Sequence, residues 1–287
     1  MPTHQPSILA PQSPIARSLF FLLHANADPR PALKALAAIT DGNRLVVGIG
    51  PTVVSALNVD IPGLHPLSPF SAHGVNVPST PRALWCWLRG TDHGELMNHA
   101  HEIEALLKPA FYLDQVLDTF MHRHNRDLTG YEDGTENPKG DDALTAALSA
   151  DGSSLVAMQQ WRHNFTAIEQ LSRSEMDDVI GRRRDDNEEL DEAPESSHVK
   201  RTEQESFTPE AFVMRRSMPW VDGQEGGLLF IAFGSSLRAF EVQMQRMAGI
   251  DDGITDSLFR ISQPITGDSY WCPPLQQRTL DLSALGL

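Results

Sequence analysis

The chain has 287 residues, 40% of them hydrophobic and 21% charged, which suits two ordinary domains or one large domain with a substantial core. Its 38 acidic residues outnumber 23 lysines and arginines, and the formal charge of -15 would repel a phosphate backbone or an anionic membrane. No nucleic-acid or membrane partner is therefore expected. No apolar run approaches the ~20 residues of a membrane-spanning helix.

The two cysteines and the start of the chain indicate a cytoplasmic protein. Cys86 and Cys272 each lie beside a tryptophan in an apolar stretch, which favours buried reduced thiols over a disulfide. The first residues lack a basic segment followed by an apolar core, and they contain no twin arginine.

The first half of the chain alternates between extended and helical patterns. Strands are predicted from β-branched and apolar runs at residues 16–25, 44–54, 83–90 and 116–124. Helices are predicted from apolar residues at helical spacing at residues 29–39 and 95–109. The resulting order, β-α-β-β-α-β, is that of a ferredoxin-like unit.

The second half repeats this order. Strands are predicted at residues 154–161, 211–220, 226–234 and 257–265, and helices at residues 164–181 and 237–249. A charged insert, residues 182–201, separates the first helix from the second strand and lacks an apolar period, as a solvated excursion does. However, it contains His198, and long structured loops inside compact domains are often functional.

The stretch GYEDGTENP, residues 130–138, lies where the two units meet. We therefore predict an N-terminal domain of residues 1–128 and a C-terminal domain of residues 129–287. The Asp-Gly and Asn-Pro pairs are typical of a turn. By composition alone the acid at Asp133 shapes this turn, and the alternative is that the turn exists to hold Asp133 at a site.

Two adjacent arginines, Arg215 and Arg216, interrupt an otherwise apolar strand. Strand alternation sends one of them inward, where a guanidinium is costly unless it meets an anion or a carboxylate. Asp133 is a candidate partner, either as an ion pair or through a shared substrate. The histidines of HAHEIE, His99 and His101, are two residues apart and do not share a helix face, which disfavours a metal site there.

Four stretches in this order, GYEDGTENP, ESSHVKR, MRRSMP and LLFIAFG, resemble the dye-decolorizing peroxidases, and the GTENP continuation resembles their bacterial cytoplasmic type B subgroup. The resemblance covers residues 18–274. It implies an α+β fold, in which two ferredoxin-like (βαββαβ) domains form a β-sandwich with peripheral helices. It also implies haem b, bound mainly by the C-terminal half, and a peroxidase that reduces hydrogen peroxide through a ferryl intermediate and oxidises dyes, phenolics and other small aromatic electron donors.

The same resemblance implies roles for individual residues. His198 becomes the axial ligand to the haem iron, Asp133 the distal acid-base residue and Arg215 the distal arginine. Ser217 would face the distal pocket and Arg182 a haem propionate, while Asp256 is the candidate acid for the second nitrogen of His198. Further contacts to the cofactor are expected from the turn and from the LLFIAF strand, at Gly134, Thr135, Glu136, Phe230 and Phe233.

The expected chemistry supports the three central assignments. A carboxylate beside the iron can move the proton of the peroxide, and a neighbouring arginine favours its ionised form. The arginine also stabilises negative charge that develops on the departing oxygen. Neutral imidazole binds iron, and a carboxylate on its other nitrogen increases its basicity.

Several alternatives stay open on the sequence. A haem- or porphyrin-processing role on the same scaffold and a non-haem ferredoxin-like stress module are the competing functions. Five aromatic residues are candidates for electron transfer to bulky donors, although ordinary packing is the simpler interpretation: Tyr131, Trp161, Trp220, Tyr270 and Trp271. A homo-oligomer is expected. Loading into an encapsulin shell through the C-terminal tail is disfavoured, because no Gly/Pro-rich linker precedes the tail.

Overall fold

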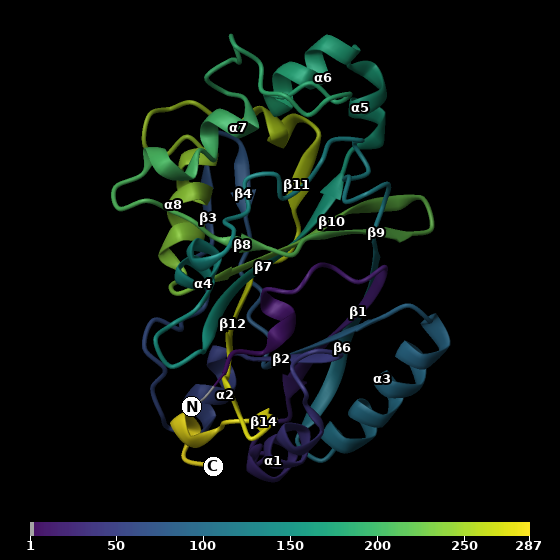
Figure 1. Ribbon diagram of the computed structural model, residues 1–287, viewed down its shortest axis with the longest axis vertical. Coiled ribbons are helices and arrows are strands. Elements are labelled where there is room, and N and C mark those ends of the chain that lie inside the picture. The colour runs from purple at the N-terminus through teal and green to yellow at the C-terminus, as the bar shows by residue number, and fades with distance from the viewer. Residues whose placement is uncertain (1–2) are drawn as a thin grey trace.

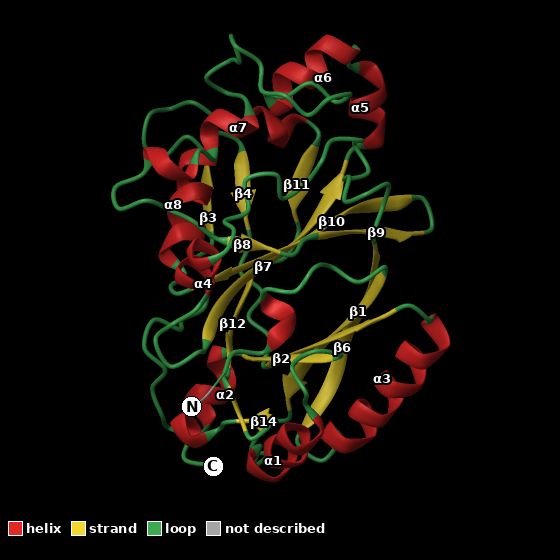
Figure 2. Cartoon of the chain, in the orientation of Figure 1, coloured by secondary structure: helices red, strands yellow, loops and turns green. Residues whose placement is uncertain are grey.

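The computed structural model describes residues 3–287 and has antiparallel sheet at its centre, with most helices on the outside (Figure 1; Figure 2). The first half contains β1 (Ile15–Leu23), α1 (Arg30–Ile39), β2 (Leu45–Ile49), β5 (Leu84–Gly90), α3 (His93–Leu107) and β6 (Phe111–Phe120). Along the chain, β2 and β5 are separated by helix α2 (Pro51–Ala56) and by a hairpin of β3 (Phe70–Ala72) and β4 (Val75–Val77). The long strands pair in the order β2-β5-β1-β6, so the predicted β-α-β-β-α-β unit is confirmed.

The second half forms the same kind of unit. Its main elements are β7 (Ser154–His163), α5 (Phe165–Gln170), α6 (Arg173–Ile180), β9 (Met218–Asp222), β10 (Glu225–Gly234), α8 (Arg238–Met247) and β12 (Asp268–Cys272). Shorter elements are α4 (Asp141–Ala147), α7 (His198–Arg201), β8 (Met214–Arg215) and β11 (Ser262–Pro264). The strand order β12-β7-β10-β9 matches that of the first half, which confirms the α+β class and the two ferredoxin-like units.

Three details of the second half differ from the prediction. The strand predicted at residues 211–220 is divided into β8 and β9. A strand was predicted at residues 257–265, but residues 257–260 form a 3-10 turn and the rest contains only the short β11. The last long strand of the unit is β12, which pairs with β7. The predicted helix at 164–181 is divided into α5 and α6 at Ser172. This serine caps α6, where its hydroxyl accepts from the Glu175 N–H and the Glu175 carboxylate accepts from the Ser172 N–H.

The two sheets meet at both edges and enclose a common core. Trp271 of β12 pairs with Ile49 of β2, and Thr119 of β6 pairs with Trp220 of β9. Aromatic side chains fill the space between the sheets, with ring centroids 5.7–6.3 Å apart: Trp85, Trp87, Phe233 and Tyr270. The sandwich therefore has an aromatic core between the sheets, and helices pack on the outer faces of the sheets (Figure 2).

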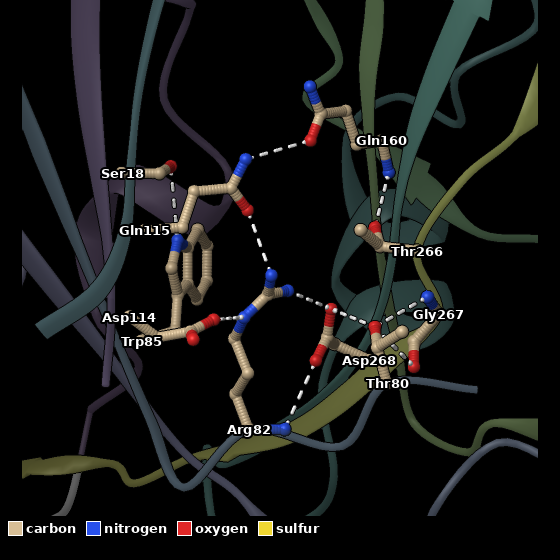
Figure 3. Close-up of polar contacts among 10 residues, drawn as sticks. All are labelled: Ser18, Thr80, Arg82, Trp85, Asp114, Gln115, Gln160, Thr266, Gly267 and Asp268. Carbon is tan, nitrogen blue, oxygen red and sulfur yellow. Dashed lines mark hydrogen bonds and ion pairs between the residues drawn. The ribbon is translucent and has the colours of Figure 1, made fainter. Parts of the chain in front are cut away.

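A buried polar network ties the halves together (Figure 3). Arg82, just before β5, donates to Asp268 of β12 at 2.8 Å and to Asp114 of β6 at 2.7 Å. A third donor of Arg82 reaches Gln115, whose amide continues to Gln160 of β7 at 3.0 Å. Burial raises the pKa of Asp268 to about 6, although the charge of Arg82 and its hydrogen bonds oppose the shift.

The cysteines pack as expected, and the C-terminal tail is also partly buried. Cys86 and Cys272 are free and buried, and burial raises the pKa of both thiols. Leu282 and Leu285 of the C-terminal segment are buried in the same hydrophobic cluster as Leu33 and Leu36 of α1, so the tail docks on its own fold. Within the described chain, no helix is long and apolar enough to cross a membrane.

Candidate active site

A cavity of about 360 Å³ lies on the outer face of the C-terminal sheet, between β7, β10, α7, α8 and the loops at residues 127–136 and 182–205. This volume falls within the range of cofactor sites, roughly 300–1,000 Å³. One part of its wall is apolar and is formed by Val213, Leu228, Phe230, Phe240, Met244 and Met247. The other part is polar and contains most of the residues singled out by the sequence.

The loop that contains Asp133 is shaped as a rigid turn. Gly130 and Gly134 both have positive φ, and a Cβ at Gly134 would lie 2.8 Å from the side-chain nitrogen of Asn137. Asn125 fixes Asp133 from both sides, because its carbonyl accepts the Asp133 N–H at 3.0 Å and its Nδ2 donates to the Asp133 carbonyl at 2.6 Å. The turn thus directs the Asp133 side chain to the cavity wall.

The same loop holds the backbone of Arg215. Oδ1 of Asn137 accepts the Arg215 N–H at 2.7 Å, and Nδ2 of Asn137 donates to the Arg215 carbonyl at 3.0 Å. The Asn137 amide therefore bonds the Arg215 backbone as a neighbouring strand would. On the other side of β8, Arg215 pairs with Ala232 of β10. From the sequence, Asn137 was predicted only as part of a turn. The sequence feature that could have indicated this role is the side-chain amide of Asn137, which lies between Asp133 and Pro138 in the chain.

Asp133 and Arg215 meet at the cavity, as the sequence predicted for a strand arginine that needs a partner. Nη1 of Arg215 lies 3.7 Å from Oδ1 of Asp133, and the side chains are 20% and 16% exposed. Both line the cavity. The carboxylate and the guanidinium can therefore contact the same small molecule.

His198 begins α7 and also lines the cavity. Its Nδ1 lies 2.8 Å from Oδ2 of Asp256, whose side chain is fully buried. Oδ1 of Asp256 accepts from the Leu258 N–H at 2.8 Å, so the carboxylate is held in place. With Nδ1–H bound to a carboxylate, the lone pair of a neutral imidazole is on Nε2, which suits a metal ligand.

Arg182 lines the cavity in an ion-paired state. Its Nη2 lies 2.6 Å from Glu136 and 3.6 Å from Glu189. Glu136 and Thr135 also line the cavity, and the Thr135 hydroxyl accepts a hydrogen bond from Asn187. A carboxylate ligand that reaches Arg182 would compete with these two acids.

Three of the expected site residues do not line this cavity. Gly134 shapes the turn behind Asp133. Phe233 points to the aromatic centre between the sheets, because Phe230 and Phe233 are three residues apart in β10 and face opposite ways. Ser217 follows the end of β8, so strand alternation does not carry it to the cavity, and its buried hydroxyl lies 3.4 Å from the Ile231 N–H as an acceptor.

His163 is a buried histidine of the cavity wall that the sequence did not mark as a site residue. Nε2 of His163 bonds Asp127 at 2.9 Å and its Nδ1 bonds Ser262 at 2.8 Å. Burial opposes ionisation of Asp127, but the bonds from His163 and Thr129 outweigh it and lower its pKa. Both nitrogens of His163 are therefore occupied, unlike those of His198.

The five aromatic candidates divide into two groups. Trp161 and Tyr131 line the cavity, and the Tyr131 hydroxyl donates to Asp177 at 2.5 Å. Burial and this carboxylate raise the pKa of Tyr131. The others are buried in the core: Trp220, Tyr270 and Trp271. Ordinary packing accounts for these three.

The residues present fit a haem. Its flat apolar ring matches the wall around Phe230 and Met244, and His198 offers an oriented imidazole nitrogen. Arg182 can pair with a propionate. At the wall, the Gln159 side-chain nitrogen is buried and has no acceptor within residues 3–287, a state that a propionate or ordered water would relieve.

Comparisons with known proteins agree with this site. The family model described as "Dyp-type peroxidase, C-terminal" matches residues 124–277, more than half of the chain. The Dye-decolorizing peroxidase of Mycobacterium tuberculosis is 29% identical over 86% of this chain and 75% of its own length. A putative dyp-type peroxidase of Shewanella oneidensis superposes with a TM-score of 0.88 at 26% identity, over 99% of this chain and 98% of the other.

A further similar structure is that of a protein solved with a bound cofactor. A variant of DypB from Rhodococcus jostii RHA1, solved in complex with heme, superposes with a TM-score of 0.84 at 26% identity, over 93% of this chain and 95% of the other. The sequence match covers Asp133, His198 and Arg215, the residues that meet at the cavity. The chain belongs to the Dyp-type peroxidase family.

Proposed function

We propose that this chain binds haem b and reduces hydrogen peroxide, with dyes, phenolics and other small aromatic molecules as one-electron donors. The observation that carries the proposal is the placement of an Asp133–Arg215 pair and a carboxylate-bound His198 around one cavity. The name of the matched family and the heme complex of a relative support it. A protein that only stored a porphyrin would not need Asp133 and Arg215 together.

Each residue has a defined task toward the cofactor. His198 would hold the iron through Nε2, and Asp256 orients the imidazole through Nδ1. Arg182 would pair with a propionate in competition with Glu136. Phe230 supplies apolar wall against the ring. When bound, haem b supplies a redox-active iron that accepts the oxidising equivalents of the peroxide and returns them one at a time.

The distal residues handle protons and charge. The Asp133 carboxylate takes a proton from one oxygen of hydrogen peroxide and delivers it to the other, which leaves as water. Arg215, 3.7 Å from Asp133, stabilises the negative charge on the departing oxygen. Two protons and two electrons are consumed in total per peroxide, and each aromatic donor contributes one electron.

Two substitutions test this division of labour. For Asp133→Asn and for Arg215→Leu we expect the reaction of the haem-loaded protein with peroxide to slow by about 10²–10³-fold, the usual cost of losing a charge-stabilising group. The measurement is the spectral change on rapid mixing with peroxide. A haem-loaded wild type whose spectrum does not respond to peroxide would refute the peroxidase function. It would leave porphyrin processing as the next candidate.

We further propose that residues 1–128 and 129–287 are the two domains, since each contains one four-stranded ferredoxin-like sheet. A cytoplasmic location is supported by the free buried thiols of Cys86 and Cys272. A homo-oligomer is supported by exposed apolar residues on one strand, Tyr112 and Val116 of β6. Light scattering of the purified protein tests the oligomer, and a monomer at micromolar concentration would contradict it.

A further inference from the structure

Two arginines are buried without a carboxylate. Arg89 at the end of β5 is 8% exposed, and Arg216 just after β8 is 7% exposed. Among residues 3–287, neither guanidinium has an acid within 4.0 Å, whereas the buried Arg201 is paired with Asp252 at 2.7 Å and Arg82 with Asp268. The chain has 38 acids, so a missing partner is not a matter of composition.

The two side chains reach the same segment of the chain. Arg89 donates to the Ser7 hydroxyl and the Pro11 carbonyl, and Arg216 donates to the Leu9 carbonyl. Carbonyl and hydroxyl dipoles solvate a guanidinium but do not cancel its charge. The N-terminal segment therefore covers two cations that keep their full charge.

Both cations retain an unused donor, and a third donor belongs to the same region. Within the described chain, Nε–H of Arg89, Nε–H of Arg216 and Nε1–H of Trp87 are buried without an acceptor. The guanidinium of Arg89 lies over the Trp87 ring, 5.0 Å from its centroid. Buried N–H groups are nearly always bonded, so three unpaired donors on side chains that contact one another or the same segment call for a common explanation.

The charges are near enough to act on one another. Burial lowers the pKa of Arg89, and burial together with the charge of Arg89 lowers the pKa of Arg216 to about 10. Both side chains are therefore protonated at neutral pH and repel each other. A small negative ion would remove the repulsion and accept the unused N–H groups at once.

We propose that a small inorganic monoanion, of the size and charge of a halide, binds between Arg89 and Arg216 with Trp87 as a further donor. The surroundings favour a small ion over phosphate, because the Phe233 ring packs with its centroid 6.3 Å from that of Trp87, and because these side chains offer three unused N–H groups within residues 3–287. The site lies apart from the active-site cavity, but Arg216 also donates to the carbonyl of Arg215 at 3.2 Å. The anion would thus secure the backbone behind the Asp133–Arg215 pair.

Crystals of the haem-loaded protein grown in bromide give the direct test. We expect an anomalous bromide peak within hydrogen-bond distance of Nε of Arg89 and Nε of Arg216. An absence of density there other than water at high bromide would overturn the proposal, as would a carboxylate from a second copy of the chain in that position.

Thermal unfolding of the haem-loaded protein gives a solution test, with chloride replaced by gluconate at constant ionic strength. Chloride should raise the unfolding temperature of the wild type and of Arg30→Met, whose exposed arginine pairs with Asp28. The chloride dependence should vanish in Arg216→Met. An equal dependence in Arg216→Met and the wild type would overturn the proposal.

A gentler variant keeps the test usable if Arg216→Met does not fold. Trp87→Phe retains an aromatic ring under Arg89 but removes the Nε1–H, and we expect the chloride concentration for half the effect to rise about tenfold, as for loss of one hydrogen bond to a charged group. An unchanged concentration would exclude Trp87 as a ligand. The net charge of -15 helps here, because it weakens non-specific anion binding at the surface.

Discussion

The amide of Asn137 offers the sharpest test of how the loop positions Arg215 and of the role proposed for this arginine. Asn137→Ala removes the acceptor for the Arg215 N–H and the donor to the Arg215 carbonyl, at 2.7 and 3.0 Å. The β10 side of the strand keeps its pairing through Ala232, so β8 should remain in the sheet. Only the two hydrogen bonds between the Arg215 backbone and the loop are lost.

The structure sets the size of the effect. Two partly buried neutral hydrogen bonds are lost, each worth about 0.5–1.5 kcal/mol, so the total is about 1–3 kcal/mol. A tenfold change in rate corresponds to about 1.4 kcal/mol. If the lost free energy would otherwise hold the Arg215 side chain at the cavity, the reaction with peroxide should slow by about 10- to 100-fold.

Rapid mixing of haem-loaded protein with peroxide, followed by its absorption spectrum, measures this rate, and the oxidation of a small phenol is measured separately. We expect the peroxide step to slow while the donor step changes less than twofold. The control is Asn98→Ala, which removes an exposed amide from α3. An Asn137→Ala protein that is less stable but reacts with peroxide at the wild-type rate would show that the amide stabilises the fold without positioning Arg215.

Three further predictions concern the cofactor and pH. His198→Ala should lose the haem absorption band and His163→Ala should keep it, and the reverse result would mean that the axial ligand is wrongly assigned. Arg182→Leu should weaken haem binding about tenfold or more in a haem titration, as for loss of a charged hydrogen bond, whereas Arg183→Leu, which removes an exposed arginine paired with Asp186, should not. Burial raises the pKa of Asp268 from 3.8 to about 6. The protonation of this carboxyl group therefore stabilises the folded protein below pH 3.8, and this stabilisation is lost as the pH rises through 6. The unfolding free energy of the wild type relative to Asp268→Asn should fall by up to about 3 kcal/mol over that range, and a flat or rising difference would contradict the shifted pKa.

The element order could be derived from the sequence alone. Period-two and helical patterns are local, so they identified both β-α-β-β-α-β units. The last strand was misplaced because residues 257–265 and β12 both have strand-like composition. Only pairing with β7 and β2 distinguishes the long strand from the short one.

The contact between Asp133 and Arg215 was predictable from the sequence for a chemical reason. An arginine in an apolar strand must find a negative partner, and Asp133 proved to be 3.7 Å from Arg215. His198 and its acid Asp256 are 58 residues apart, so their contact depends on how α7 packs against the loop before β11. The sequence could nominate Asp256 but could not place it.

The sequence by itself therefore determined the types of element, their order and the charged groups that cannot be buried alone, because these follow from local periodicity and from the cost of desolvation. The tertiary structure alone decided which side of a strand faces the cavity, as with Phe230 and Phe233, and which distant groups meet. It also placed Asn137 against Arg215. Such contacts depend on register and on the packing of loops against sheets, and a shift of one residue would reverse them.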